Sequence, residues 1–220
     1  MKNKTVTSAR IAMAMCVLTL LSLLLLHFLS PEFEPSWRMV SEYALGNYNG
    51  VLLLMFISWA LSSWALAFAV RPLLHTTRSK IGWIFLIISG IGMMMGGLFS
   101  IPHNLHGPAA ALGLPSFCVA AILITVGLRK SPKGKSVFPL LTAHLPWISL
   151  ALMAAAMGVM ISGFITAGID MSTGKAPERL PEGVIGAVGY VNRLLIVAYC
   201  FWTWSIARKL QDSKLSFTTT

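Results

Sequence analysis

The sequence predicts an all-α polytopic membrane protein, a single bundle of six transmembrane helices, and three observations lead to it. Hydrophobic residues make up 56% of the 220 residues and charged residues only 11%, with a mean hydropathy of +0.75. An ordinary soluble domain has about 25% charged residues. The apolar residues fall into six long runs, and the basic residues gather at alternate connections between them. This composition excludes a disordered chain, a coiled coil and a nucleic-acid-binding module.

Each apolar run is long enough to cross a bilayer, whose core of about 30 Å requires about 20 helical residues. The runs are continuous rather than alternating, which indicates helices and not barrel strands. The fifth run is too long for one perpendicular span, so we expect it to tilt or to begin at the interface. The predicted spans are residues 10–29, 50–70, 81–100, 109–128, 138–167 and 184–206, in one domain of residues 1–220.

The charged residues predict the orientation of the bundle. Six of the seven acidic residues lie on one side of the predicted membrane, and 13 basic residues lie on the other side with Asp212. The basic residues are Lys2, Lys4, Arg10, Arg71, Arg78, Lys80, Arg129, Lys130, Lys133, Lys135, Arg208, Lys209 and Lys214. Positive charge favours the cytoplasmic side, so both termini are predicted to be cytoplasmic and the net charge of +10 is a topology signal. The predicted location is the cell membrane, which in a bacterium is the cytoplasmic membrane.

The longest connection on the extracytoplasmic side, residues 30–49, predicts a short helix on the membrane surface. Ser36 can cap this helix, and Gly46 can end it. Trp37, Val40 and Ala44 would share one face, and Trp37 and Tyr43 are residues that favour the membrane interface.

Small residues recur at every fourth position of two predicted spans and predict close helix contacts. They are Ala154, Gly158, Ser162 and Thr166 on the fifth span and Gly92 and Gly96 on the third. Two alternatives follow. The small residues pack helices within one bundle, or they form the seam of a homo-oligomer.

Arg193 is the most informative polar residue, because it lies inside the sixth predicted span. A charge near mid-bilayer costs roughly 2.5–3.5 kcal/mol on insertion scales, so such a residue normally faces the bundle and has a partner. Snorkelling of its long side chain to the interface is the alternative. Glu42 precedes the second span on the same side, so we predict an Arg193–Glu42 pair or cluster, with Asn192 beside it.

Three histidines fall on the extracytoplasmic side and could hold a divalent metal ion. His103 and His106 are three residues apart in one loop, and His27 ends the first span. Imidazole is a common ligand of zinc and related metals, and Glu42 could be a fourth ligand. The alternative is that these histidines form hydrogen bonds with helix ends at the interface.

Three motifs, in order, resemble the domain-of-unknown-function 998 family of small prokaryotic integral membrane proteins. Residues 40–46 (VSEYALG) resemble a serine-glutamate signature between the first two spans. Residues 97–99 (GLF), followed by His106 and Gly107, resemble its segment after the third span, and residues 189–193 (GYVNR) resemble its closing helix. The similarity covers about residues 10–210.

The resemblance implies the fold, with Glu42, His106 and Arg193 as the recurring polar set, and it brings no activity. Two residues of the family pattern are missing here. No aspartate follows Pro102, and alanines stand where a second histidine is expected, at Ala110 and Ala111.

The function predicted from these features is binding of a small polar ligand or a lipid headgroup at an extracytoplasmic cluster of Glu42, His106, Asn192 and Arg193. A structural role of the same cluster in holding the bundle together is a further interpretation. The alternative is an intramembrane metal-dependent hydrolase or lipid-modifying enzyme with a metal-activated water at the histidines. The second alternative is a small oligomeric transporter. The partners predicted in every case are the lipid bilayer and this ligand, with no nucleic acid.

Overall fold

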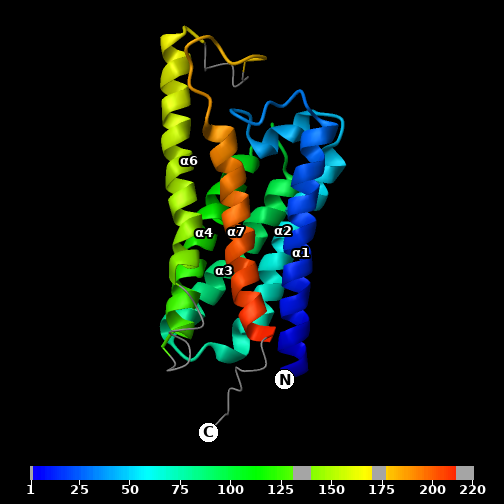
Figure 1. The fold of residues 1–220 in the computed structure, drawn as a ribbon, viewed down its shortest axis with the longest axis vertical. Helices are drawn as coiled ribbons and strands as arrows, with labels where there is room; N and C mark the ends of the chain where they lie inside the picture. Colours follow the sequence, from blue (N-terminus) through cyan, green and yellow to red (C-terminus); the bar gives the residue numbers. More distant parts are fainter. Residues whose placement is uncertain (1, 131–139, 170–176, 212–220) are drawn as a thin grey trace.

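The computed structural model describes residues 2–130, 140–169 and 177–211. Within these residues, six long α-helices run side by side along the longest axis of the molecule (Figure 1). They are α1 (Lys2–Leu29), α2 (Asn49–Val70), α3 (Thr77–Leu98), α4 (His106–Leu128), α6 (Leu140–Thr166) and α7 (Val188–Gln211). Two short 3-10 helices are η1 (Val40–Leu45) and η2 (Arg71–Leu73). Residues 138–139 of the predicted fifth span, Lys133, Lys135 and Lys214 lie outside the described residues.

Five of these helices are long and apolar enough to cross a membrane, namely α1, α2, α3, α4 and α6. The chain is therefore a multi-pass integral membrane protein in contact with lipid. The sixth helix, α7, carries Asn192 and Arg193 in its upper half and a basic pair, Arg208 and Lys209, in its last turn. These polar residues lower its hydropathy, yet α7 packs against α1 and α6 inside the bundle (Figure 1).

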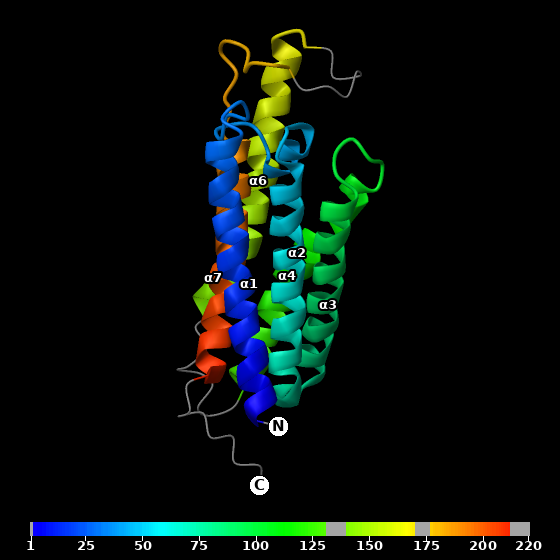
Figure 2. The same ribbon diagram turned by 90° about the vertical axis from the view of Figure 1, so that its right-hand side faces the viewer.

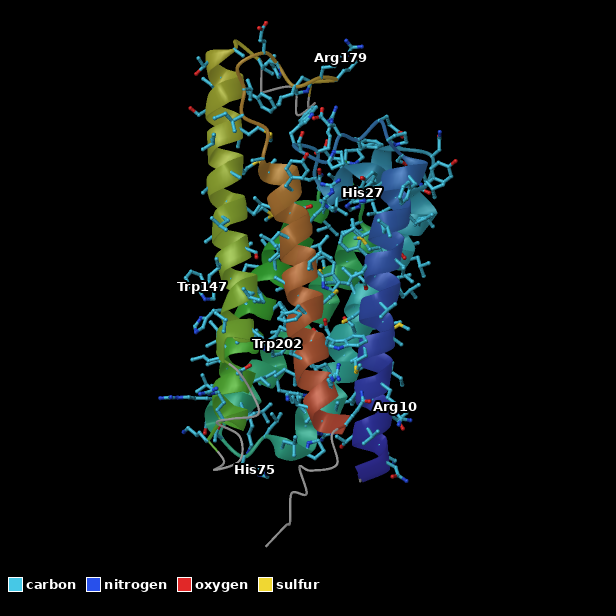
Figure 3. All side chains as sticks on the ribbon, in the orientation of Figure 1. Arg10, His27, His75, Trp147, Arg179 and Trp202 are labelled. Carbon is cyan, nitrogen blue, oxygen red and sulfur yellow. The ribbon has the colours of Figure 1, made fainter. Side chains whose placement is uncertain are left out.

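The two ends of the bundle are distinguished by the histidines labelled in Figure 3. His27 lies near one end, which we call the upper end, and His75 lies at the other, the lower end. The upper end is the side predicted to be extracytoplasmic. Figure 2 shows that α6 extends at the upper end beyond the other helices.

Helix boundaries differ from the predicted spans where polar residues provide caps. Thr76 accepts a hydrogen bond from the backbone N–H of Ser79 at 3.1 Å, so α3 begins four residues before the predicted span. The short helix also differs from its prediction. Ser36 donates to a carboxylate oxygen of Glu34 and does not cap a helix, and η1 begins at Val40. Gly46 follows the end of η1, as predicted.

The small residues of the third span pack helices within the bundle, as the first alternative predicted. A Cβ atom on Gly92 would lie 2.4 Å from the Cα atom of Gly113, so the backbones of α3 and α4 approach closely at this point. The stripe on α6 differs. Ala154, Gly158, Ser162 and Thr166 are all exposed, and a Cβ atom on Gly158 would meet no atom within 4 Å. Packing within the bundle is therefore wrong for this stripe, and a seam between copies stays a prediction.

Candidate functional site

Arg193 is buried in the upper half of α7, with 8% of its surface exposed, and two side chains bind its guanidinium. Its Nε atom donates to Nε2 of His27 at 2.7 Å, and its Nη2 atom donates to the hydroxyl oxygen of Tyr43 at 3.0 Å. The other nitrogen of His27, Nδ1, lies 2.7 Å from the carbonyl oxygen of Leu23. These two bonds require a neutral imidazole with its proton on Nδ1. His27 therefore serves α7 as a hydrogen-bond acceptor.

Backbone carbonyl groups bind the remaining nitrogen, Nη1. It donates to the carbonyl oxygens of Arg38 at 2.8 Å, Gly189 at 2.9 Å and Pro35 at 3.3 Å. The guanidinium charge is thus surrounded by neutral oxygen and nitrogen acceptors. Such acceptors offset the cost of burying an ion without supplying a counter-charge.

The predicted pair between Arg193 and Glu42 is wrong. Glu42 forms an ion pair with Arg38 at 2.7 Å, the only salt bridge among the described residues, and it accepts the backbone N–H of Met39 at 2.8 Å. A second nitrogen of Arg38 donates to the carbonyl oxygen of Pro177 at 2.7 Å. Glu42 therefore orients the side chain of Arg38, which also contacts the loop that contains Pro177. Arg193 instead binds the backbone of Pro35 and Arg38.

Residues 35–45, which we call the roof, are fixed to α7 by two more contacts. Asn192 Oδ1 accepts the backbone N–H of Val40 at 2.9 Å, and the N–H of Gly189 donates to the carbonyl oxygen of Ser36 at 2.9 Å. A Cβ atom on Gly189 would lie 2.4 Å from the carbonyl oxygen of Pro35. Only glycine permits this approach, so the roof lies directly on the first turn of α7.

A cavity lies beneath η1, between α2, α3, α4 and α7. Its volume is about 80 Å³. This is well below the roughly 300–1,000 Å³ of pockets that enclose a drug-sized ligand, so the cavity has room for a small group only. The lining residues are Met39, Val40, Ser41, Met55, Phe56, Trp59, Gly92, Met93, Gly96, His106, Ala110, Leu114, Asn192 and Ile196.

The structure brings together two of the four predicted ligand-binding residues in this cavity, Asn192 and His106. His106 Nδ1 lies 2.9 Å from the carbonyl oxygen of Phe99, and no described residue bonds its Nε2 atom. With the hydroxyl of Ser41, these groups form a polar edge around apolar walls. The other two predicted residues, Glu42 and Arg193, lie outside the lining and hold the roof above it.

The predicted metal ligands are not gathered in one place. His27 is engaged by Arg193, and His103 Nδ1 accepts the backbone N–H of Leu105 at 3.1 Å. Over residues 2–130, 140–169 and 177–211 there is no group of three or more His, Cys, Asp or Glu side chains that could hold a metal ion. Nothing in this geometry supports the predicted site at His27, His103 and His106, which stays a prediction.

Sequence reasoning missed the roles of two residues that matter here. Tyr43 was predicted at the membrane interface, whereas it is fully buried and binds Arg193; its place directly after Glu42 in the serine-glutamate motif was the available signal. Trp59 lines the cavity. No sequence pattern distinguishes it from the other six tryptophans.

Comparison with known proteins yields one match. The model of a family described as "Protein of unknown function (DUF998)" matches residues 13–209, which is nearly the whole described chain. No curated protein matches the chain, and no solved structure matches it.

Proposed function

Because this chain belongs to the family described as "Protein of unknown function (DUF998)", which brings no activity to transfer, we propose its function from geometry alone. The protein is a non-enzymatic membrane protein that binds a small polar ligand or a lipid headgroup in the cavity beneath the roof. The observation that carries this proposal is the position of Asn192 and His106 at the polar edge of an otherwise apolar cavity.

The four residues of the predicted polar cluster divide into two roles in this proposal. Asn192 and His106 contact the ligand. Arg193 and Glu42 hold the roof in place, the first through the backbone of residues 35–38 and the second through Arg38. A preformed roof favours binding because the ligand does not have to order the loop.

We further propose that α7 is the sixth span and that both termini are cytoplasmic. Its 24 residues rise about 36 Å at 1.5 Å per residue, which is sufficient to cross a bilayer. Arg193 lies in its upper half and is fully engaged by protein groups, so its charge does not face lipid. The ends of α1 and α7 that carry Lys4, Arg10, Arg208 and Lys209 then lie together on the basic, cytoplasmic side (Figure 3).

The test is a variant that fills the cavity beside a matched control. Ala110 lines the cavity, whereas its neighbour Ala111 is exposed. We expect wild-type protein and Ala111→Leu, purified in mild detergent, to retain a small polar molecule or a lipid that mass spectrometry detects, and Ala110→Leu to lose most of it. Equal retention by all three proteins would show that the cavity is not the binding site.

The two alternatives from the sequence stay hypotheses. No arrangement in the part of the chain that the structure describes favours the metal-dependent hydrolase, since no three possible ligands come together and His27 and His103 form hydrogen bonds within the protein. The oligomeric transporter would require a seam between copies, for which the exposed stripe on α6 is the candidate.

A further inference from the structure

His106 presents an unused hydrogen-bond acceptor at the cavity. Its Nδ1 atom lies 2.9 Å from the carbonyl oxygen of Phe99, and a carbonyl oxygen only accepts, so Nδ1 carries the proton of the ring. The Nε2 atom of the neutral imidazole is then an acceptor, and no described residue donates to it. His106 is partly exposed and lines the cavity, so Nε2 is available to a group that brings its own proton.

Ser41 and Asn192 add hydrogen-bond donors to the same lining. The Ser41 hydroxyl has no partner among the described residues, and it can donate or accept. Asn192 Oδ1 accepts the backbone N–H of Val40, and Asn192 Nδ2 donates to Met153 Sδ at 3.3 Å, which uses one of its two amide protons. The lining therefore offers one fixed acceptor beside groups that can donate, which is the complement of a hydroxyl group.

The charges around the cavity exclude an ionic ligand group. No Lys, Arg, Asp or Glu is among the described residues that line it. The nearby charges are engaged elsewhere, Arg193 by its five acceptors and Glu42 by Arg38 and the backbone of Met39. An anion would thus meet the lone pair of His106 without a cation beside it, and an ammonium group would find no carboxylate.

The volume restricts the group further. At about 30 Å³ per water molecule in the liquid, a cavity of about 80 Å³ has room for about three non-hydrogen atoms. A hydroxymethyl group fits this space, whereas a phosphodiester headgroup does not. Ser41 and His106 are partly exposed, so the polar edge of the cavity reaches the molecular surface and the rest of a longer ligand can remain outside.

We infer that the cavity binds the uncharged hydroxymethyl group of an alcohol. The hydroxyl donates to His106 Nε2 and accepts from Ser41 or Asn192, and its carbon lies against the apolar walls. This inference rests on the proposed function and adds the chemical class of the ligand group. The same group occurs in two sources, the headgroup of a neutral glycerol lipid and a free polyol such as glycerol.

The test compares three lipids that differ at one oxygen atom. They are dioleoylglycerol, with a free hydroxyl, its acetyl ester, and dioleoyl phosphatidic acid, with a charged phosphate. Each is titrated into detergent-purified protein, and the bound fraction is measured by native mass spectrometry. We expect the wild type to bind dioleoylglycerol about fivefold or more tighter than the other two, since a hydrogen bond of about 1 kcal/mol corresponds to about fivefold.

Two variants and a matched control locate the hydroxyl. His106→Phe keeps a ring and removes the acceptor, so it should lose most of the preference for dioleoylglycerol. Ser41→Ala, a small change at a partly exposed residue, should weaken binding of dioleoylglycerol and leave the acetyl ester unchanged. His103→Phe changes the other histidine of the same loop, which is exposed and is not among the lining residues, and it should bind as the wild type does.

Free glycerol distinguishes the second source. If saturation-transfer difference NMR shows glycerol bound to the wild type and not to Ala110→Leu, while dioleoylglycerol does not bind, the hydroxyl belongs to a free polyol and the inference holds.

The remaining outcomes separate the inference from the proposed function. Equal binding of the three lipids by the wild type, tighter binding of phosphatidic acid, or an unchanged preference in His106→Phe overturns the inference about the hydroxyl and leaves the binding cavity in place. The wild-type preference does not depend on the stability of any variant. Binding of none of the lipids and no glycerol also overturns the inference. The proposed function falls with it only if wild type, Ala110→Leu and Ala111→Leu retain the same ligand equally.

Discussion

The contribution of the hydrogen bond between Tyr43 and Arg193 to stability can be tested by removing one atom, the hydroxyl oxygen of Tyr43. Tyr43 is fully buried, and its hydroxyl accepts from Arg193 Nη2 at 3.0 Å. Its ring also lies 5.7 Å from the guanidinium carbon and packs edge-on against Phe33 and His27. Phenylalanine keeps these ring contacts, so Tyr43→Phe removes the hydrogen bond alone and leaves one guanidinium N–H without an acceptor.

Two magnitudes bound the expected effect. Hydrogen bonds between helices in membranes contribute on average about 0.6 kcal/mol, with a maximum near 1.7. Bonds to charged groups contribute about 1.5–3 kcal/mol. Arg193 is charged and 8% exposed, so no water replaces the lost acceptor. We therefore expect Tyr43→Phe to lower the free energy of unfolding by about 1.5–2 kcal/mol.

The assay is equilibrium unfolding of detergent-solubilised protein, with Tyr48→Phe as the control because Tyr48 is 42% exposed. The control should change stability by less than about 0.5 kcal/mol. In double-mutant cycles with Arg193→Gln, Tyr43→Phe should couple by about 1 kcal/mol or more, and Glu42→Gln by less than about 0.5. If Tyr43→Phe behaves as Tyr48→Phe does, or if Glu42 couples more strongly than Tyr43, our account of Arg193 is refuted.

Two further predictions concern packing and topology. Gly92→Ala should destabilise the bundle by about 2 kcal/mol or more in the same unfolding assay, because its methyl group would clash with Gly113. The control Gly158→Ala, where no atom is near, should be neutral or slightly stabilising. Equal effects of the two substitutions would refute the close approach of α3 and α4 at Gly92. A membrane-impermeant maleimide added to intact cells should label Asn104→Cys and not Lys130→Cys. The three native cysteines are buried, so we expect little background labelling. Labelling of Lys130→Cys alone would show that the topology is the reverse of the one proposed.

Hydrophobic periodicity and length were sufficient to predict the positions of the six long helices, because lipid requires continuous apolar helices. The residues at which the helices begin and end were less predictable. The start of α3 at Thr77 depends on the hydrogen bond from the backbone N–H of Ser79 to the hydroxyl of Thr76. The start of η1 depends on whether the Ser36 hydroxyl bonds Glu34 or caps a helix, and it bonds Glu34. Several local hydrogen-bonding alternatives exist for such residues, and packing decides among them.

The candidate site was predictable only in some of its members, namely Asn192 and His106 in the cavity lining, and not in its bonds. A buried arginine in a span indicates a partner, and a carboxylate is the partner that sequence reasoning can name. Arg193 instead donates to three backbone carbonyl groups, an imidazole nitrogen of His27 and the hydroxyl oxygen of Tyr43. Every residue has a backbone carbonyl group, so the sequence does not show which carbonyl groups accept hydrogen bonds from Arg193. The outward-facing stripe on α6 shows the same limit, since residue spacing does not reveal which face of a helix is covered.

The acceptors around Arg193 have a consequence for the order in which the membrane protein is made. His27, Tyr43 and the carbonyl groups of Pro35 and Arg38 are synthesised about 150 residues before α7 emerges from the ribosome. A charge costs roughly 2.5–3.5 kcal/mol at the centre of a spanning helix; nearer the end, where Arg193 lies, the cost is smaller but still disfavours insertion of α7 on its own. We therefore expect the first helix and the roof, which are made first, to supply the acceptors that Arg193 needs when α7 is added. Insertion of α7 and closure of the bundle should then be coupled, through contacts between the beginning of the chain and its end.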